Sequence, residues 1–290
     1  MKLFSAPPPA KLTAPASATA KPRATNAAKD TPSVVRILQV ARLAQGGKWR
    51  VEAMRALSEP CLYWFTRGQG RITVGGITRG YGPHNAVFVP AGMMHAMELG
   101  PQTQGTAIFL GRNTDLTLPH TAQHLRIRDA APQSEFSNIL ESVQREMDST
   151  APGADRAARH HLGLLGVWLE RQIAQAPADS VKPSAARRLV GRYSALLERD
   201  FKSGNSISDY AQHLGVTPTH LTRACKSACG RSALDLLQDR RLYEARRLLS
   251  DSTLSVKDIS LQLGFKTPSY FTRAFHARTG ATPSGFRRKA

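Results

Sequence analysis

The chain has 290 residues, of which 41% are hydrophobic, so it is long enough and apolar enough for two domains that each bury a core. Its 40 Lys and Arg against 21 Asp and Glu give a formal net charge of +19 at pH 7. Three cysteines, Cys61, Cys225 and Cys229, are too few for a disulfide framework and lack the spacing of a zinc finger. No run of eighteen apolar residues occurs, so we expect no membrane partner.

The first 32 residues predict a disordered basic tail. Residues 1–32 consist mainly of Ala, Pro, Lys, Thr and Ser, with five basic residues against one acidic residue. Almost no large apolar side chain follows Phe4, so this segment cannot bury enough surface to offset its chain entropy. We therefore expect the first folded domain to begin near residue 33.

Residues 33–125 have the pattern of an all-β domain. Short runs rich in β-branched and aromatic residues are the predicted strands: 34–40, 49–54, 61–65, 71–74, 86–89, 95–99 and 106–110. Glycines at positions 68, 70, 75, 76, 80 and 82 separate them as turn residues. Many short strands joined by glycine turns predict a sandwich or barrel.

One short motif in this region resembles part of a known fold. Pro90-Ala91-Gly92-Met93-Met94-His95 is similar to the second motif of cupin barrels, which implies a cupin-like β-barrel. In cupin enzymes the histidine of this motif joins two histidines and a glutamate from an earlier strand around a metal ion. No histidine occurs between Trp49 and Gly70, so we expect no metal site and no cofactor. His95 is instead the candidate for lining a ligand pocket.

Residues 126–180 return to the period of helices. Apolar residues at helical spacing form two stripes, at Phe136, Ile139, Leu140, Val143 and Met147, and at Leu162, Leu165, Leu169 and Ile173. Pro152 and Gly153 separate the two predicted helices, and the prolines and small residues of 176–184 predict a linker.

The second of these helices is apolar on more than one face, since Leu164, Val167 and Trp168 adjoin its stripe. We predict that one face packs on the barrel and that the other pairs with the same helix of a second subunit, in a two-fold homodimer that depends on Leu165 and Leu169. The alternative, in which both faces pack within one chain, stays open.

The last hundred residues contain one small unit twice. Residues 207–216 align with residues 256–265, which pairs Asp209 with Asp258, Leu214 with Leu263 and Gly215 with Gly264. Each copy has a short helix, a glycine that ends it and a Thr-Pro pair that begins a second helix. Two helices joined by so short a turn form a helix-turn-helix unit, which places its second helix in the major groove of DNA.

The second helices, residues 217–227 and 268–278, are the predicted DNA-reading elements. Their outward positions, with one preceding lysine, give the candidate DNA-binding residues: Thr219, His220, Thr222, Arg223, Lys266, Ser269, Tyr270, Thr272 and Arg273. Short hydroxyls and arginine suit base edges and phosphates, because arginine bridges guanine O6 and N7. The basic charge lies in the same region, since residues 182–290 carry 20 basic against 8 acidic residues and residues 33–181 carry 15 against 12.

A series of spaced residues extends across both units. They are Arg241, Leu242, Ala245, Leu248, Leu249, Ile259, Gly264, Phe265, Ser269, Tyr270, Phe271, Thr272, Arg273, Phe275, Gly280, Pro283 and Arg287. This spacing closely resembles the C-terminal half of the AraC/XylS transcription regulators, over residues 185–289. Ala233 and Ser260 depart from the pattern, because they stand where the family usually has proline and alanine.

The resemblance implies a multidomain α+β protein with a cupin-like sensor domain (33–125), a helical connector that dimerises (126–180) and an all-α domain with two helix-turn-helix units (185–290). It implies a DNA-binding transcription regulator, an activator more than a repressor and not an enzyme, acting as a homodimer in the cytoplasm at the nucleoid. The implied partners are double-stranded DNA, a small-molecule effector and RNA polymerase, with His95 as the candidate effector-binding residue. Two alternatives stay open: a metal-dependent cupin enzyme with a helical appendage, and a regulator whose barrel only dimerises.

Overall fold

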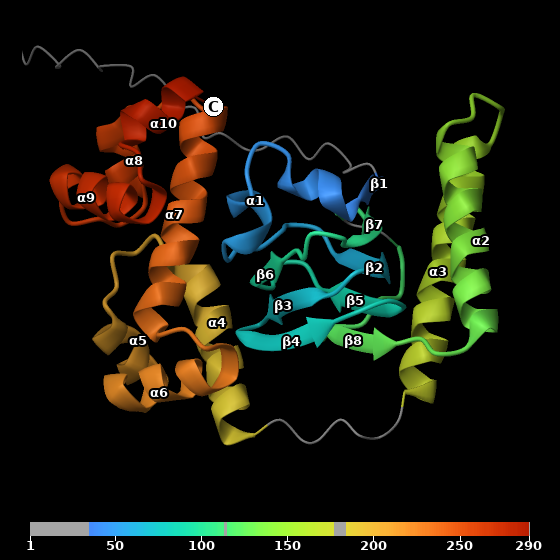
Figure 1. Cartoon of the computed structure of the whole chain (residues 1–290), viewed down its shortest axis with the longest axis horizontal. Helices are drawn as coiled ribbons and strands as arrows, with labels where there is room; N and C mark the ends of the chain where they lie inside the picture. The colour runs from blue at the N-terminus through green and yellow to red at the C-terminus, as the bar shows by residue number, and fades with distance from the viewer. Residues whose placement is uncertain (1–34, 113–114, 177–183, 290) are drawn as a thin grey trace, which may run out of the picture. The chain divides into compact units, whose positions relative to one another are not determined.

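The computed structural model describes residues 35–112, 115–176 and 184–289. The predicted tail, residues 1–32, and most of the predicted linker, residues 176–184, lie outside the described residues. Figure 1 shows the strands in the first half of the chain and helices in the second half, with two long helices between them in sequence.

The residues that the structure describes form eight strands in two antiparallel sheets. The five-stranded sheet has the order β1-β7-β2-β5-β8, and the three-stranded sheet has the order β4-β3-β6. Their bounds are β1 Arg36–Gln39, β2 Cys61–Arg67, β3 Gly70–Val74, β4 Ile77–Tyr81, β5 Asn85–Val89, β6 His95–Glu98, β7 Gln104–Phe109 and β8 Gln123–Arg126. The predicted all-β character of this region is confirmed.

Strand β2 explains how the two sheets and the helices share the core. Its first five residues are all buried, because side chains on successive strand residues point to opposite faces and both faces are covered. Tyr63 and Phe65 pack with Ile72 of the smaller sheet. Leu62 and Trp64 pack with residues of the two long helices. The larger sheet is therefore the middle layer of the strand-containing half.

Helices α2 (Ala130–Met147) and α3 (Ala154–Gln175) cover that sheet. Phe136 and Trp168 stack against Trp64, with ring centroids 4.9 Å and 6.4 Å from it. The indole N–H of Trp168 donates to the backbone oxygen of Pro132 at 2.9 Å, which satisfies the polar atom of this buried ring. The predicted contact between subunits through Leu165 and Leu169 is wrong, because both lie with Leu162 in this core of a single chain.

One predicted strand is wrong. Residues 49–54 contain the one-turn helix α1 (Trp49–Glu52), and the strand predicted at 34–40 ends at Gln39, where the 3-10 helix η1 (Val40–Ala44) begins. The Trp49 ring packs edge-on against Tyr243 and Phe286, with centroids 5.7 Å and 6.1 Å away. Burial of this ring against residues distant in sequence outweighs the weak local preference for a strand.

Two strands were not predicted. β4 pairs with β3 through a turn at Gly75 and Gly76, whose φ angles of 56° and 76° match a tight hairpin. β4 itself contains Gly80, which the sequence suggested as a turn residue. β8 is a polar edge strand of four residues, so its sequence carries little of the alternation that marks a strand.

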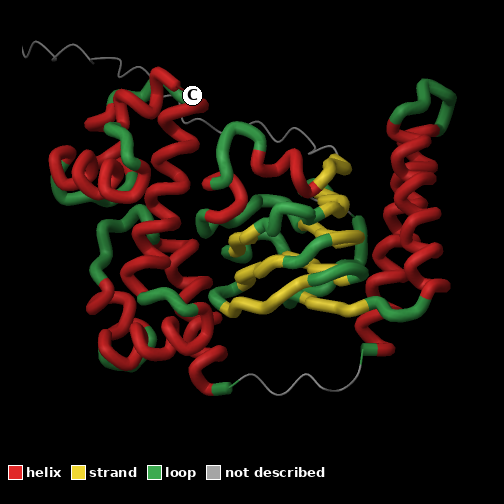
Figure 2. Tube along the Cα trace, viewed as in Figure 1, coloured by secondary structure: helices red, strands yellow, loops and turns green. Residues whose placement is uncertain are grey.

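The described residues of the second half form helices joined by loops, without strands, as Figure 2 shows. Its helices are α4 Ala185–Asp200, α5 Ile207–His213, α6 Pro218–Cys229, α7 Ala233–Asp251, α8 Val256–Gln262, α9 Pro268–Thr279 and α10 Pro283–Lys289. The predicted fold class, an α+β first part and an all-α second part, is confirmed. Among the described residues, no helix combines the length and the apolar character that crossing a membrane requires.

Candidate nucleic-acid interface

Helices α5 and α6 form the first helix-turn-helix unit, and local capping determines where each begins and ends. Ser206 and Asp209 form a reciprocal capping box at the start of α5. Gly215, at φ 71°, makes the turn that an L side chain would strain. Thr217 then caps α6 by accepting from the His220 backbone N–H, and Pro218 occupies the first turn.

Helices α8 and α9 repeat this arrangement in the second unit. Ser255 caps α8, Gly264 turns the chain at φ 71°, and Thr267 caps α9 ahead of Pro268. Both second helices end at a left-handed glycine, Gly230 for α6 and Gly280 for α9. The same signals at the same spacing therefore build the same unit twice, and the predicted second helices are confirmed to within two residues at each end.

Each second helix turns one face into the core. Leu221 and Cys225 of α6 are fully buried, and so are Phe271 and Phe275 of α9. Burial raises the pKa of the Cys225 thiol to about 12, so this group stays neutral at pH 7. Cys225 acts here as the smaller counterpart of Phe275.

The opposite faces carry the candidate DNA-binding residues. Seven of the nine are exposed, namely Thr219, His220, Arg223, Lys266, Ser269, Tyr270 and Arg273, whereas Thr222 and Thr272 are half-buried at the margin. Within the part of the chain that the structure describes, Arg223 and Arg273 form no hydrogen bond or ion pair. Their guanidinium groups are therefore free to meet an external acceptor.

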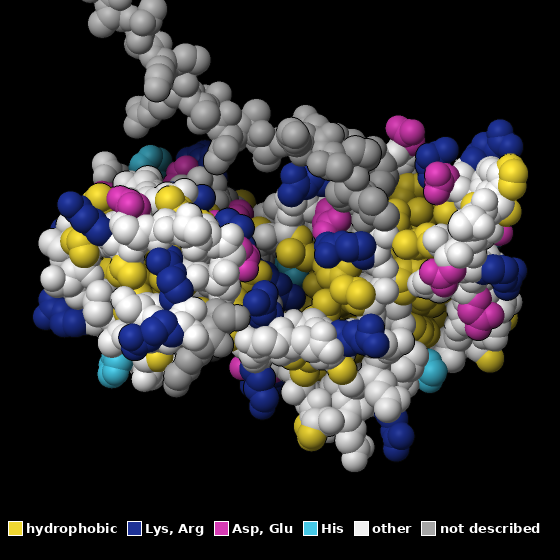
Figure 3. All heavy atoms as spheres, turned by 90° about the horizontal axis from the view of Figure 1, so that it is seen from above, with side chains coloured by type: hydrophobic (Ala, Val, Ile, Leu, Met, Phe, Trp, Pro, Cys, Tyr) yellow, Lys and Arg dark blue, Asp and Glu magenta, His cyan; other side chains and the backbone are white. Residues whose placement is uncertain are grey.

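Two more exposed residues extend these faces. Lys226 follows Thr222 by four residues on α6, and His276 follows Thr272 by four residues on α9. Neither residue is among the predicted DNA-binding residues, although the helical period that identified Thr222 and Arg223 also reaches them. In Figure 3, Lys and Arg side chains are spread over the helical second half of the chain, on the face in view.

Other arginines of this half are structural. Arg240 of α7 is 5% exposed and forms a two-pronged ion pair with Glu198 of α4, at 2.6 Å and 2.9 Å. The Arg241 side chain donates to the backbone oxygen of Phe201 at 2.7 Å. Arg278 of α9 pairs with Asp235 of α7. These contacts join α7 to α4 and to α9. Some arginines of this half therefore stabilise the fold, whereas others, such as Arg223 and Arg273, are exposed.

His95 lies in the buried interior of the strand-containing half. Its Nδ1 faces the backbone oxygen of Met93 at 3.1 Å, so it carries the proton, and its Nε2 accepts from the Tyr63 hydroxyl at 3.0 Å. Burial and the charge of Arg55 lower the pKa of His95 to about 3, so the ring is neutral. Both ring nitrogens are thus occupied within the protein, and His95 does not line the cavity described below.

Comparison with known proteins supports this description of the second half. Residues 210–289 match the family described as a helix-turn-helix domain. The transcriptional regulator GlxA of Rhizobium meliloti is 33% identical over 143 residues, covering 47% of this chain and 44% of GlxA. The arabinose operon regulatory protein of Salmonella typhimurium is 35% identical over 159 residues, covering 55% of each.

A solved structure of the C-terminal domain of AraT, a response regulator from Geobacillus stearothermophilus, is 28% identical with a TM-score of 0.34, over 38% of this chain and 88% of that one. The chain spans about half the length of the curated relatives it matches. The family match runs from α5 to α10, so this part of the chain is similar to the helix-turn-helix domain of known transcription regulators.

Proposed function

We propose that this protein is a sequence-specific transcription regulator that inserts α6 and α9 into successive major grooves of double-stranded DNA. The observation that carries the proposal is the pair of matched units, each presenting an exposed and unpaired arginine, Arg223 or Arg273, from a helix with the same caps and the same buried positions. Arginine in this position suits guanine, and the hydroxyls beside it suit bases or phosphates.

Removing these arginines is expected to weaken DNA binding. Arg223→Ala and Arg273→Ala should each cost about 1–3 kcal/mol on specific DNA and relax preference at a few base pairs. Binding titrations on specific and random duplexes measure this. Arg192→Ala, which removes an exposed arginine from α4, is the matched control and should leave affinity nearly unchanged. Normal affinity in both recognition-helix variants would overturn the proposal, and equal losses on both duplexes would make the arginines phosphate contacts.

We further propose that the protein is a homodimer through the exposed face of α3. Leu165 and Leu169, which the sequence suggested for this contact, are internal, whereas Leu164 and Val167 are the exposed large apolar residues of α3, at 53% and 39% exposure. An exposed apolar pair on a long surface helix suits a self-complementary two-fold contact.

Changing Leu164 and Val167 together to aspartate is expected to give a folded monomer. Both side chains are exposed, so the substitutions remove apolar contact between subunits without opening the core. Light scattering and circular dichroism measure mass and fold. Leu261→Asp, an equally exposed leucine on α8, is the control and should stay dimeric. A dimeric Leu164→Asp/Val167→Asp variant would place the interface elsewhere.

A single subunit is expected to protect an asymmetric site. Because α7 packs against α6 of the first unit and α8 of the second, α6 and α9 should enter grooves about 34 Å apart on one face of the duplex. Footprinting of the monomeric Leu164→Asp/Val167→Asp variant should show protection of two adjacent turns without a palindrome. Affinity should also fall steeply with added salt. Protection of one turn only would contradict a rigid pair of units.

The remaining parts of the proposal concern the whole protein. We propose that residues 33–125 sense a small-molecule effector, that residues 126–180 connect and dimerise, and that residues 185–290 bind DNA. Activation through RNA polymerase in the cytoplasm, without enzymatic activity, completes this picture. The relatives reported above are regulators, which supports it. Stoichiometric metal in the purified protein would instead favour a cupin enzyme.

A further inference from the structure

A small cavity opens between the two sheets. It has a volume of about 100 Å³ and lies between the β3–β4 hairpin of the smaller sheet and strands β5 and β8 of the larger one. Its lining residues are Ile72, Val74, Ile77, Arg79, Val87, Ala122, Gln123 and His124. Four of these are branched aliphatic side chains, so the walls are mostly apolar.

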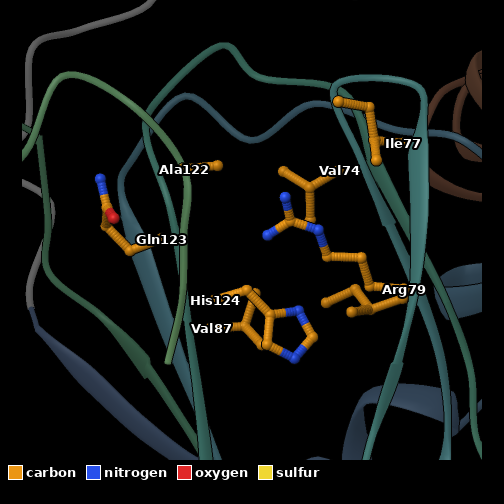
Figure 4. A pocket seen from close by; sticks show the side chains of 8 residues that line it. Val74, Ile77, Arg79, Val87, Ala122, Gln123 and His124 are labelled. Atoms are coloured by element: carbon orange, nitrogen blue, oxygen red, sulfur yellow. The ribbon is translucent and has the colours of Figure 1, made fainter. Parts of the chain in front are cut away.

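The cavity has few polar side chains, namely those of Arg79, Gln123 and His124. Figure 4 shows the Arg79 side chain reaching into the cavity from β4, with the His124 ring beside it. His124 Nε2 lies 3.2 Å from the side-chain oxygen of Asn85 and is therefore its donor. Gln123 is bonded to Thr121 instead, and its amide points away from the cavity.

The charge of this site is positive and uncompensated. Burial, together with the charge of Arg79, lowers the pKa of His124 to about 4, so His124 is neutral at pH 7. Arg79 forms no ion pair or hydrogen bond with any residue that the structure describes. One guanidinium thus faces a mostly aliphatic cavity, and a bound anion would provide the partner that the chain itself does not supply.

We propose that this cavity binds a small aliphatic monocarboxylate, with its carboxylate on Arg79 and its branched hydrocarbon end between Ile72, Val74 and Val87. A guanidinium holds a carboxylate through two parallel N–H···O bonds, and the aliphatic walls take up the hydrocarbon by burial. A free phosphate suits this site less, because it has no apolar part to contact the aliphatic walls. The inference rests on the proposed function, since the ligand class named is that of the effector.

The volume limits the size of the ligand. A cavity of about 150 Å³ accommodates the six carbon atoms of benzene, so one of about 100 Å³ encloses roughly four non-hydrogen atoms. Isobutyrate has six, and its carboxylate would lie at the mouth where Arg79 is exposed. Longer fatty acids exceed this space.

The test adds isobutyrate to the full-length protein in the absence of DNA. Binding is measured by saturation-transfer NMR. We expect saturable binding that Arg79→Gln weakens at least tenfold, whereas Arg71→Gln, an exposed arginine on the neighbouring strand β3, leaves it unchanged. The neutral alcohol of the same shape, 2-methylpropan-1-ol, should bind at least tenfold more weakly than isobutyrate. Octanoate and inorganic phosphate should not displace isobutyrate.

A second variant keeps the test independent of Arg79. Ala122→Leu fills the cavity from the segment before β8 and should abolish binding while the circular dichroism spectrum stays that of the wild type. The inference would be overturned if isobutyrate does not bind, or if neither Arg79→Gln nor Ala122→Leu changes its affinity. Displacement by phosphate at equal affinity would also overturn the assignment to carboxylates. DNA affinity measured separately shows whether the proposed regulator function holds in either case.

Discussion

Replacing Leu165 and Leu169 together by aspartate is expected to unfold the strand-containing half of the protein. Both side chains are almost completely buried, at 2% and 1% exposure, in the core that α3 shares with Trp168, Phe136 and the larger sheet. Each substitution removes a buried leucine, at about 2–5 kcal/mol, and places a carboxylate in an apolar core. The sum approaches or exceeds the usual total stability of about 5–15 kcal/mol.

Circular dichroism and tryptophan fluorescence measure this effect directly, because Trp168 and Trp64 lie in the same core. The matched control is the Leu164→Asp/Val167→Asp variant, which changes the same helix by the same chemistry on its exposed side. A cooperative unfolding transition like that of the wild type in the Leu165→Asp/Leu169→Asp variant would mean that these leucines do not face the sheet.

Truncating Arg240 is expected to destabilise the DNA-binding half by about 3–5 kcal/mol. The Arg240 guanidinium is buried, makes both bonds to Glu198, and lies 3.9 Å from the centre of the Phe201 ring. Arg240→Ala leaves Glu198 and Glu244 without this partner in a largely dry environment, and an unpaired buried charge is costly.

Urea denaturation followed by circular dichroism measures the change in the free energy of unfolding. Arg247→Ala is the control, because Arg247 also pairs with Glu244 but its side chain is 46% exposed, so its loss should cost about 1 kcal/mol or less. Equal effects of the two substitutions would show that burial does not set the contribution of the Arg240 ion pair.

The helix-turn-helix units were predictable because their signals are local. A capping serine or threonine, a glycine at positive φ and a proline in the first turn act within a few residues, and the chain carries this set twice. The same holds for the outward positions of α6 and α9, since the period of a helix separates the buried Leu221 and Phe271 from the exposed Arg223 and Arg273. The duplication strengthened the prediction of each unit, because the same signals occur at the same spacing in the other unit.

Contacts between residues distant in sequence determine the features that the sequence did not predict. The sequence showed that α3 is apolar on more than one side, but only packing against the sheet showed that Trp168 lies inside and Leu164 outside. Trp49 forms a helical turn because its ring reaches Tyr243 and Phe286, almost two hundred residues away. Arg79 and His124 line one cavity because β4 and β8 belong to different sheets that face each other. Capping and helical period are properties of neighbouring residues, whereas burial and charge pairing depend on which segments meet in space, so only the tertiary structure could determine them.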